Sequence, residues 1–268
     1  MSEGPWWLAE WTAAVRRPAD AVELDVAAIV MSALGSVHVR RAEDIATQRA
    51  RLDRLADGAP EGTFEHWHRL LFVIHGFGGD GERYHDARSS FVPDVLDRHA
   101  GIPIALSVVA MEVGRRIGVP VQGIGMPGHF LVRAVGAVPA FVDPFNGGEV
   151  LDEQGCRQRF ATMFGDAQTF QPEFLQPVSS HQILLRMLMN LKSNYARRRD
   201  LITLGDVLHM RWFLPGVSLD EGRELVRILG VNGRFRAGNE VLDALFDAHP
   251  EASSVLDDER RRLRLRMN

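Results

Sequence analysis

Apolar residues in the first third of the chain recur every three or four positions, the spacing that predicts amphipathic helices. Two such helices are expected over residues 21–31 and 42–55, and a turn at residues 57–60 ends the second. A third helix should begin after Thr63, whose side chain is a suitable N-cap, and should stop before the glycine cluster that begins at Gly76. The first third of the chain is therefore predicted to be helical.

The middle of the chain combines one buried helix with a change to strand periodicity. After a short helix near residues 91–99, the segment from Pro103 to Gly118 is apolar on nearly every side, which predicts a helix in the centre of the core. Proline suits its first turn and glycine suits its end. Three β-type runs separated by glycine and proline then predict a small antiparallel sheet, at residues 121–126, 129–135 and 140–142. Helices followed by strands indicate an α+β fold.

The last third of the chain returns to helical periodicity. Five segments carry it: residues 182–191, 204–213, 219–229, 234–248 and 254–266. Their short connections suggest stacked helix pairs of the tetratricopeptide type, in one or two degenerate repeats. Two arginine runs, at residues 197–199 and 260–262, have acidic neighbours, which favours solvated helix faces over phosphate contacts.

Composition and charge limit the classes of function. The chain has 268 residues, of which 46% are hydrophobic and 25% are charged, as expected for a globular protein with a real core. Its formal charge of −4 gives no reason to expect a nucleic-acid partner. No apolar run approaches the roughly 20 residues of a membrane-spanning helix, and residues 1–7 lack the pattern of a signal peptide. A cytoplasmic protein without a membrane partner is therefore expected.

Three weaker motifs favour structural roles. The glycines of residues 76–81 match G-x-G-x-x-G, but a helix rather than a strand precedes them, so a turn is favoured over a phosphate-binding loop. His66 and His68 point to different sides of a helix, which opposes a shared metal. Trp7 and Trp11 have the spacing of a terminal helix docked onto its own core, which is favoured over a partner anchor. No metal and no cofactor is expected.

The strongest chemical signal is a histidine and an aspartate at the ends of neighbouring predicted strands. His129 opens one strand and Asp143 closes the next, so the two can meet as the base and the orienting carboxylate of a catalytic triad. The buried helix from Pro103 is where such a triad places its nucleophile, because the helix dipole lowers the pKa of a thiol. The pair also has a structural interpretation, since leaving either group buried and unpaired would cost about 1–3 kcal/mol.

Several motifs surround this pair. They are Tyr84-His85-Asp86-Ala87-Arg88-Ser89-Ser90, Val95-Leu96-Asp97-Arg98, Gly101-Ile102-Pro103-Ile104-Ala105-Leu106-Ser107, Gly118-Val119-Pro120, Pro127-Gly128-His129-Phe130 and Val142-Asp143-Pro144-Phe145-Asn146-Gly147-Gly148. Together with residues 184–195, they resemble the SirB-type bacterial family, in which a transglutaminase-like domain precedes tetratricopeptide-like helices. Ser89 stands where that family usually has asparagine.

The resemblance implies a transglutaminase or papain-like core, whose enzymes use Cys, His and Asp in that chain order. His129 and Asp143 match the second and third members. Registering Gly118-Val119-Pro120 on the family pattern places the cysteine at about Pro103, which has no nucleophile. The nucleophile of the family is therefore missing from its expected position.

Two other residues could replace the missing nucleophile. Cys156 follows both His129 and Asp143 in the chain, so it is expected to be a packing residue. It is the one cysteine of the chain, which excludes an internal disulfide and a zinc site with two thiolates. Ser107 lies four residues beyond Pro103 on the same helix face and is the alternative nucleophile. A hydroxyl in the middle of a helix more often bonds the carbonyl four residues back.

The sequence therefore predicts three parts: an N-terminal helical region (1–97), a transglutaminase-like core (98–178) and C-terminal tetratricopeptide-like helices (179–268). The leading hypothesis is a non-catalytic interaction or regulatory module. It would bind a protein or peptide in the former active site, on the concave face of the helical repeats, or in both. Arg88, Gly128 and Phe130 are the expected binding residues.

Two alternatives stay open. One is an amide or ester hydrolase or acyltransferase that uses Ser107 or an activated water with His129 and Asp143. The other is a scaffold whose core has no ligand at all.

Overall fold

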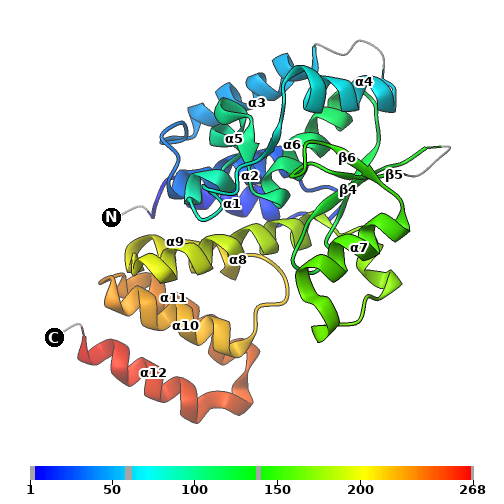
Figure 1. Ribbon diagram of the computed structural model, residues 1–268. Helices are drawn as coiled ribbons and strands as arrows, with labels where there is room; N and C mark the ends of the chain where they lie inside the picture. Colours follow the sequence, from blue (N-terminus) through cyan, green and yellow to red (C-terminus); the bar gives the residue numbers. More distant parts are fainter. Residues whose placement is uncertain (1–3, 58–61, 137–139, 267–268) are drawn as a thin grey trace. The chain divides into compact units, whose positions relative to one another are not determined.

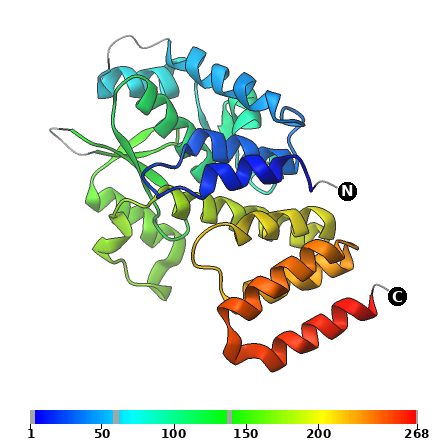
Figure 2. The same ribbon diagram turned by 180° about the vertical axis from the view of Figure 1, so that it is seen from behind.

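The computed structural model describes residues 4–57, 62–136 and 140–266 (Figures 1 and 2). Residues 58–60 of the predicted turn, and Pro139 between two predicted strands, lie outside these ranges. The chain forms two compact units, Met1–Met187 and Leu188–Asn268, whose boundary falls inside one helix, α8 (Ser180–Arg198). The division predicted at residues 97/98 and 178/179 stays a prediction. Within the described residues, no helix is both long and apolar enough to span a bilayer.

Helices form the first part of the first unit, as the sequence predicts. They are α1 (Trp7–Val15), α2 (Leu24–Met31), α3 (Glu43–Ala56), α4 (Phe64–His68), α5 (Val92–Arg98) and α6 (Pro103–Arg116), with short 3-10 turns at Ser32–Leu34 and Ala87–Ser90. Thr63 caps α4 by accepting a hydrogen bond from the backbone N–H of His66, and a π-helical turn, Arg69–Ile74, continues the helix. Trp7 and Trp11 of α1 are buried, which confirms a docked terminal helix.

The helix α6 occupies the centre of this unit. Eleven of its residues are buried, Pro103 opens it, and Gly118 follows it with φ of +76°. The indole Nε1 of Trp67 donates a hydrogen bond to the carbonyl oxygen of Ala110 at 2.9 Å, which ties α4 to this central helix. The predicted position of the helix in the core is confirmed.

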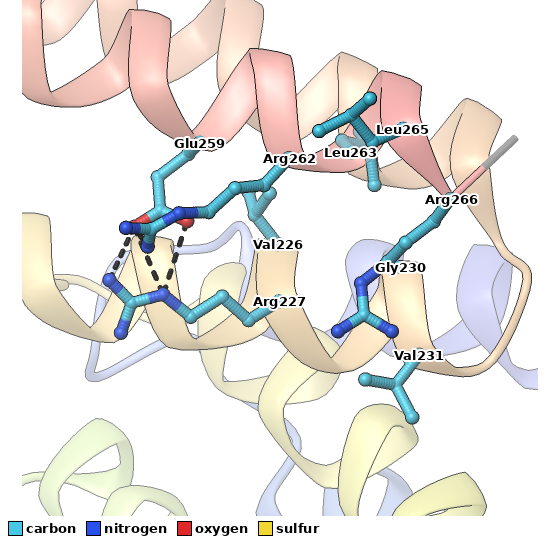
Figure 3. A pocket seen from close by; sticks show the side chains of 9 residues that line it. All are labelled: Val226, Arg227, Gly230, Val231, Glu259, Arg262, Leu263, Leu265 and Arg266. Carbon is cyan, nitrogen blue, oxygen red and sulfur yellow. Dashed lines mark hydrogen bonds and ion pairs between the residues drawn. The ribbon is translucent and has the colours of Figure 1, made fainter.

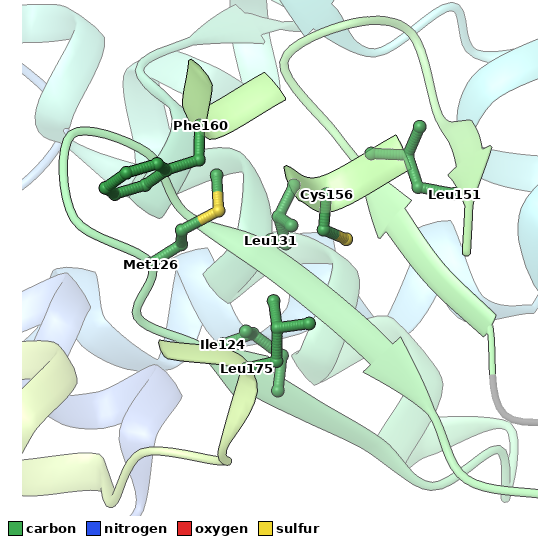
Figure 4. Packing of buried hydrophobic residues seen from close by; sticks show 7 residues of the cluster. All are labelled: Ile124, Met126, Leu131, Leu151, Cys156, Phe160 and Leu175. Atoms are coloured by element: carbon green, nitrogen blue, oxygen red, sulfur yellow. The ribbon is translucent and has the colours of Figure 1, made fainter. Parts of the chain in front are cut away.

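The sheet has four antiparallel strands in the order β3-β4-β5-β6. They are β3 (Val121–Ile124), β4 (Leu131–Ala134), β5 (Ala140–Asp143) and β6 (Glu149–Leu151), and β4 pairs with both β3 and β5 through Val132. The helix α7 (Glu153–Phe164) and two 3-10 turns, Gly165–Ala167 and Pro172–Leu175, follow. Figure 4 shows the apolar cluster that β3, β4, β6 and α7 share, which includes Cys156 and Phe160.

The glycine cluster differs in part from the predicted turn. Gly76 has φ of +63°, as a left-handed turn requires, but Gly78–Gly79 forms a short strand, β1, parallel to β2 (Ala100–Gly101). A helix precedes the cluster and no α-helix follows it directly, so it lacks the strand–loop–helix setting of a dinucleotide loop.

The second unit is helical. After the C-terminal part of α8 come α9 (Leu201–Trp212), α10 (Leu219–Val231), α11 (Phe235–Ala248), a 3-10 turn (Pro250–Ala252) and α12 (Ser253–Leu265) (Figure 1). The starts of α9 and α11, and those of α10 and α12, are spaced by the ~34 residues of a tetratricopeptide repeat. The predicted α+β class is confirmed, with helices on both sides of a small antiparallel sheet in the sequence.

Candidate functional site

The histidine and the aspartate singled out by the sequence are hydrogen-bonded. Asp143 is the last residue of β5, and His129 lies two residues before the adjacent strand β4. The imidazole Nε2 of His129 is 2.8 Å from the carboxylate Oδ2 of Asp143, and the two residues are 7% and 0% exposed. The predicted contact is confirmed, and its catalytic role stays a prediction.

Asp143 is held as a carboxylate by a set of donors. Its Oδ1 accepts backbone N–H groups of Phe145 at 3.1 Å and Asn146 at 3.2 Å, and its Oδ2 accepts the side-chain amide of Asn146 at 2.8 Å. The guanidinium of Arg159, on α7, is 3.5 Å from the same Oδ2. Burial raises the pKa of Asp143, but the hydrogen bonds from His129 and Asn146 lower it more, so the pKa lies below its ordinary value.

This carboxylate fixes the tautomer of His129. An ionised carboxylate only accepts hydrogen bonds, so Nε2 of the imidazole carries a proton; when the ring is neutral, Nδ1 is then the acceptor. Among the described residues, no group donates to or accepts from Nδ1. The ring of Phe145 stands edge-on to the imidazole, with centroids 6.1 Å apart. His129 therefore has the protonation pattern of a general base or of an acceptor for a bound donor.

Arg186 holds the turn that carries His129. This residue of α8 lies in the first unit, and its Nη1 and Nη2 donate to the carbonyl oxygens of Met126 at 2.9 Å and His129 at 2.8 Å. Its guanidinium also lies 5.4 Å from the centroid of the Phe130 ring. The arginine thus spans both ends of the Met126–His129 turn, and the geometry makes it a positioning residue for the imidazole.

The N-terminus of α6 is linked to the same site through β1. Gly79 of β1 pairs with Gly101 of β2, which precedes α6 by one residue, Ile102. The N–H of Gly79 also donates to the carbonyl oxygen of Phe145 at 2.7 Å. A Cβ on Gly79 would lie 2.4 Å from the Phe145 ring, so only glycine fits there. The helix end that should carry the nucleophile is therefore tied to the loop after Asp143.

Among the described residues of α6, the first two turns offer no thiol and no hydroxyl free of a hydrogen bond. Pro103 is the first residue of α6. The hydroxyl of Ser107 donates to the carbonyl oxygen of Pro103 at 2.8 Å, and Ser107 is 0% exposed. This is the helix-internal hydrogen bond that the sequence favoured.

Cys156 packs in the apolar cluster between the sheet and α7 (Figure 4). It is fully buried, and burial, followed by the charges of Asp152 and Asp143, raises the pKa of its thiol to about 12. The thiol stays protonated at neutral pH and has no access to a substrate. The expected packing role of Cys156 is confirmed.

The three expected binding residues occupy different environments. Arg88 donates from Nε to Oδ1 of the buried Asp94 at 2.6 Å, and its side chain is 43% exposed. Gly128 has φ of +73° and packs against the ring of Phe164 on α7, so a side chain there would be strained. Phe130 is 1% exposed beneath Arg186. Their role in binding stays a prediction.

The histidines near α4 have partners other than a metal. Nδ1 of His66 lies 2.9 Å from the hydroxyl of Thr63, and Nε2 of His68 lies 2.7 Å from the carbonyl oxygen of Gly148. Over residues 4–57, 62–136 and 140–266, no group of three or more His, Cys, Asp or Glu side chains is arranged to hold a metal ion.

Three residues of the site were not predicted from the sequence: Asn146, Arg159 and Arg186. Asn146 had a local signal, because Asp followed three residues later by Asn in a Pro-containing turn allows the two side chains to bond. Arg186 had none, since it reaches His129 from 57 residues away. Arg159 lies on α7, a helix the sequence analysis did not identify.

Comparisons with known proteins find a family model that includes this site, and several relatives. The model of the transglutaminase-like superfamily matches residues 38–189. A UPF0162 protein of Xylella fastidiosa (strain 9a5c) is 40% identical over 132 residues, which cover 48% of this chain and 47% of the relative. A UPF0162 protein of Vibrio cholerae is 32% identical over 152 residues, 56% of each chain.

A more distant similarity is to F-box only protein 21 of Mus musculus, which is 30% identical over 133 residues, 46% of this chain and 20% of that protein. The chain therefore spans about half the length of the bacterial relatives it matches. No solved structure gives a significant match.

Proposed function

The chain belongs to the transglutaminase-like superfamily, and we propose that it acts as a non-catalytic module that binds a protein or peptide at the site around His129 and Asp143. A cytoplasmic location, and a closer kinship with SirB-type bacterial proteins, belong to the same proposal. The kinship is supported by the motifs around Pro103 and His129 and by the similarity to the UPF0162 proteins.

The observation that carries the proposal is the state of the three candidate nucleophiles. Pro103 offers no nucleophile, the Ser107 hydroxyl is buried and bonded inside its own helix, and the thiol of Cys156 is buried with a pKa of about 12. A base and its orienting carboxylate cannot form a covalent intermediate without a nucleophile. Binding through the acceptor Nδ1 of His129 needs no such group.

A second candidate function is favoured by one observation. The 2.8 Å contact between His129 and Asp143 has the geometry of the base and orienter of a hydrolase, and Nδ1 is left as a base. An amide or ester hydrolase or acyltransferase could then use an activated water, or Ser107 after a rotation that breaks its bond to Pro103. The two functions differ in whether substrate is turned over.

The test compares the wild type with His129→Ala and Ser107→Ala on a panel of activated esters and peptide amides. Ser32→Ala is the matched control, because the Ser32 hydroxyl is also fully buried and donates to the carbonyl oxygen four residues back, at 2.9 Å. We expect no hydrolysis above the rate of His129→Ala. Turnover that is lost in His129→Ala but kept in Ser32→Ala would refute the non-catalytic proposal. Ser107→Ala then separates the two mechanisms, because turnover is lost if Ser107 is the nucleophile and kept if water is.

The binding arm uses an array of immobilised peptides probed with the full chain. We expect a reproducible set of bound peptides that the wild type retains and His129→Ala loses, because the variant removes the acceptor while Asp143 keeps its other donors. An identical set of bound peptides for both proteins would place binding elsewhere and refute a role for this site.

A further inference from the structure

The second unit contains a pocket of about 450 Å³ between α10 and α12 (Figure 3). Its lining includes Val226, Arg227 and Val231 from α10 and Arg262, Leu263 and Arg266 from the end of α12. Arg266 lies four positions after Arg262 and three after Leu263, so its side chain is on the same helix face as both. The pocket lies within the size range of small-ligand and side-chain sites, about 300–1,000 Å³.

The pocket carries more positive than negative charge. One buried carboxylate, Glu259, is shared by three guanidinium groups: its Oε1 is 3.1 Å from Nη2 of Arg223, 3.0 Å from Nε of Arg227 and 3.7 Å from Nη1 of Arg262. Among these three arginines, and within the described residues, Arg223 alone has a second carboxylate, that of Asp220 at 3.0 Å. Glu259 is 1% exposed, so its carboxylate pairs with the arginines and is not accessible to a ligand.

Three of the arginines have unused hydrogen-bonding capacity. The side chains of Arg227 and Arg262 are 48% and 64% exposed, and within the described residues Glu259 is the one acid that pairs with them. Arg266 forms no ion pair in the part of the chain that the structure describes. In Figure 3, Arg227 and Arg262 stand at one end of the pocket and Arg266 at the other.

Apolar side chains line the pocket between its two charged ends. Val226 and Leu263 are buried, whereas Val231 and Leu265 are 44% and 72% exposed. At Gly230 the two helices approach closely, because a Cβ there would lie 2.8 Å from Leu263. The pocket therefore offers an apolar base to a ligand whose acidic groups meet arginines at both ends.

We propose that this pocket binds an acidic peptide segment, with an apolar side chain between α10 and α12 and carboxylates on Arg227 and Arg262 at one end and on Arg266 at the other. Guanidinium groups pair with carboxylates through two parallel hydrogen bonds, which favours this partner chemistry. The inference adds a second binding surface to the proposed function and stands whether or not the His129 site binds.

A peptide fits the pocket better than a nucleic acid. Proteins that bind single-stranded nucleic acids stack the bases on aromatic side chains, and no aromatic residue lines this pocket. The apolar base gives no hydrogen bond to a phosphodiester, whereas it can cover an apolar side chain of a peptide.

The test measures fluorescence anisotropy of the full chain with a labelled hexapeptide in which two leucines are flanked by two glutamates on each side. We expect saturable binding that weakens at least about tenfold, or ~1.4 kcal/mol, in Arg262→Ala and in Arg266→Ala. Arg261→Ala is the matched control, because Arg261 lies on the same helix, is 71% exposed and pairs with Asp258 outside the pocket. It should bind as the wild type does.

Two further probes separate the alternatives. A peptide with serine in place of leucine should bind more weakly, because it leaves the apolar base uncovered, and a single-stranded oligonucleotide should not compete. Equal weakening by Arg261→Ala, competition by the oligonucleotide, or no saturable binding at 1 mM peptide would overturn the inference. Binding lost in His129→Ala but kept in Arg262→Ala and Arg266→Ala would also overturn it, while leaving the proposed function standing.

Discussion

Replacing Arg186 by alanine should destabilise the turn that carries His129. The guanidinium donates to the carbonyl oxygens of Met126 and His129, at 2.9 and 2.8 Å, and lies over Phe130. A buried acceptor left without its partner costs about 1–3 kcal/mol. The Met126 carbonyl keeps the hydrogen bond from the N–H of His129, at 3.1 Å, so the loss falls mainly on the His129 carbonyl, and we expect about 1–3 kcal/mol. Arg186→Lys keeps one donor group but not the fork, and should lose about half as much.

The measurement combines two readouts, because a stability loss alone does not show positioning. Hydrogen exchange of the β4 amides reports the local free energy of opening, and NMR of the His129 ring reports the geometry and protonation of the imidazole. Arg133→Ala is the matched control: Arg133 lies on β4 and donates to Oε1 of Gln122 at 2.9 Å, but it contacts no carbonyl of the turn. The control should lose less than about 1 kcal/mol.

Two results would refute this reasoning. Equal losses of protection in Arg186→Ala and Arg133→Ala would mean that the two carbonyl bonds add nothing beyond an ordinary half-buried contact. Unchanged ring signals of His129 in Arg186→Ala would mean that the turn keeps its shape without the guanidinium, and Arg186 would then be a packing residue only.

Four other outcomes can be checked. Val109→Ala, in the buried centre of α6, should lower the free energy of unfolding by about 1–3 kcal/mol in urea titrations. Burial raises the pKa of Asp25, but the neighbouring arginines lower it more, so the folded state favours the charged carboxylate. Burial leaves the pKa of Glu112 raised, so the folded state disfavours its charge. Asp25→Asn should therefore lower the free energy of unfolding at pH 7 more than Glu112→Gln does. The pKa of Asp143 is lowered in the folded state, so on acidification the unfolded chain binds a proton at this carboxyl first, near pH 4. The free energy of unfolding should therefore fall as the pH drops below about 5, and it should fall less steeply in Asp143→Asn. Iodoacetamide should not alkylate Cys156 in the native protein, as mass spectrometry can show, but should alkylate it in urea.

The helices were predictable from the sequence because their signals are local. The apolar periodicity and the Thr63 cap can be read from residues close together in the sequence, and α4 and α6 begin at the residues that the sequence predicts. The strand β6 and the helix α7 were not identified. Glu149–Leu151 is three residues long with two exposed positions, and α7 has buried residues only at Cys156 and Phe160, so neither gives a periodic pattern.

The site was predictable only where chain order and strand pairing determine it. His129 and Asp143 meet because adjacent antiparallel strands bring the start of one beside the end of the next. Arg159 and Arg186 come from helices outside the sheet, and no spacing rule connects an arginine to a partner tens of residues away. Long-range contacts of this kind follow from packing, which a local pattern does not contain.

The unequal hydrogen bonding of the His129–Asp143 pair supports a binding role. Asp143 accepts four hydrogen bonds, so residues of the protein already satisfy its carboxylate oxygens. His129 gives one side-chain hydrogen bond, and its Nδ1 has no partner among the described residues although the residue is only 7% exposed. Nδ1 is not a buried unpaired atom, so it can be reached from solvent and by a ligand. The open nitrogen accepts a hydrogen bond, so the group it suits is a donor such as a backbone N–H of a bound peptide.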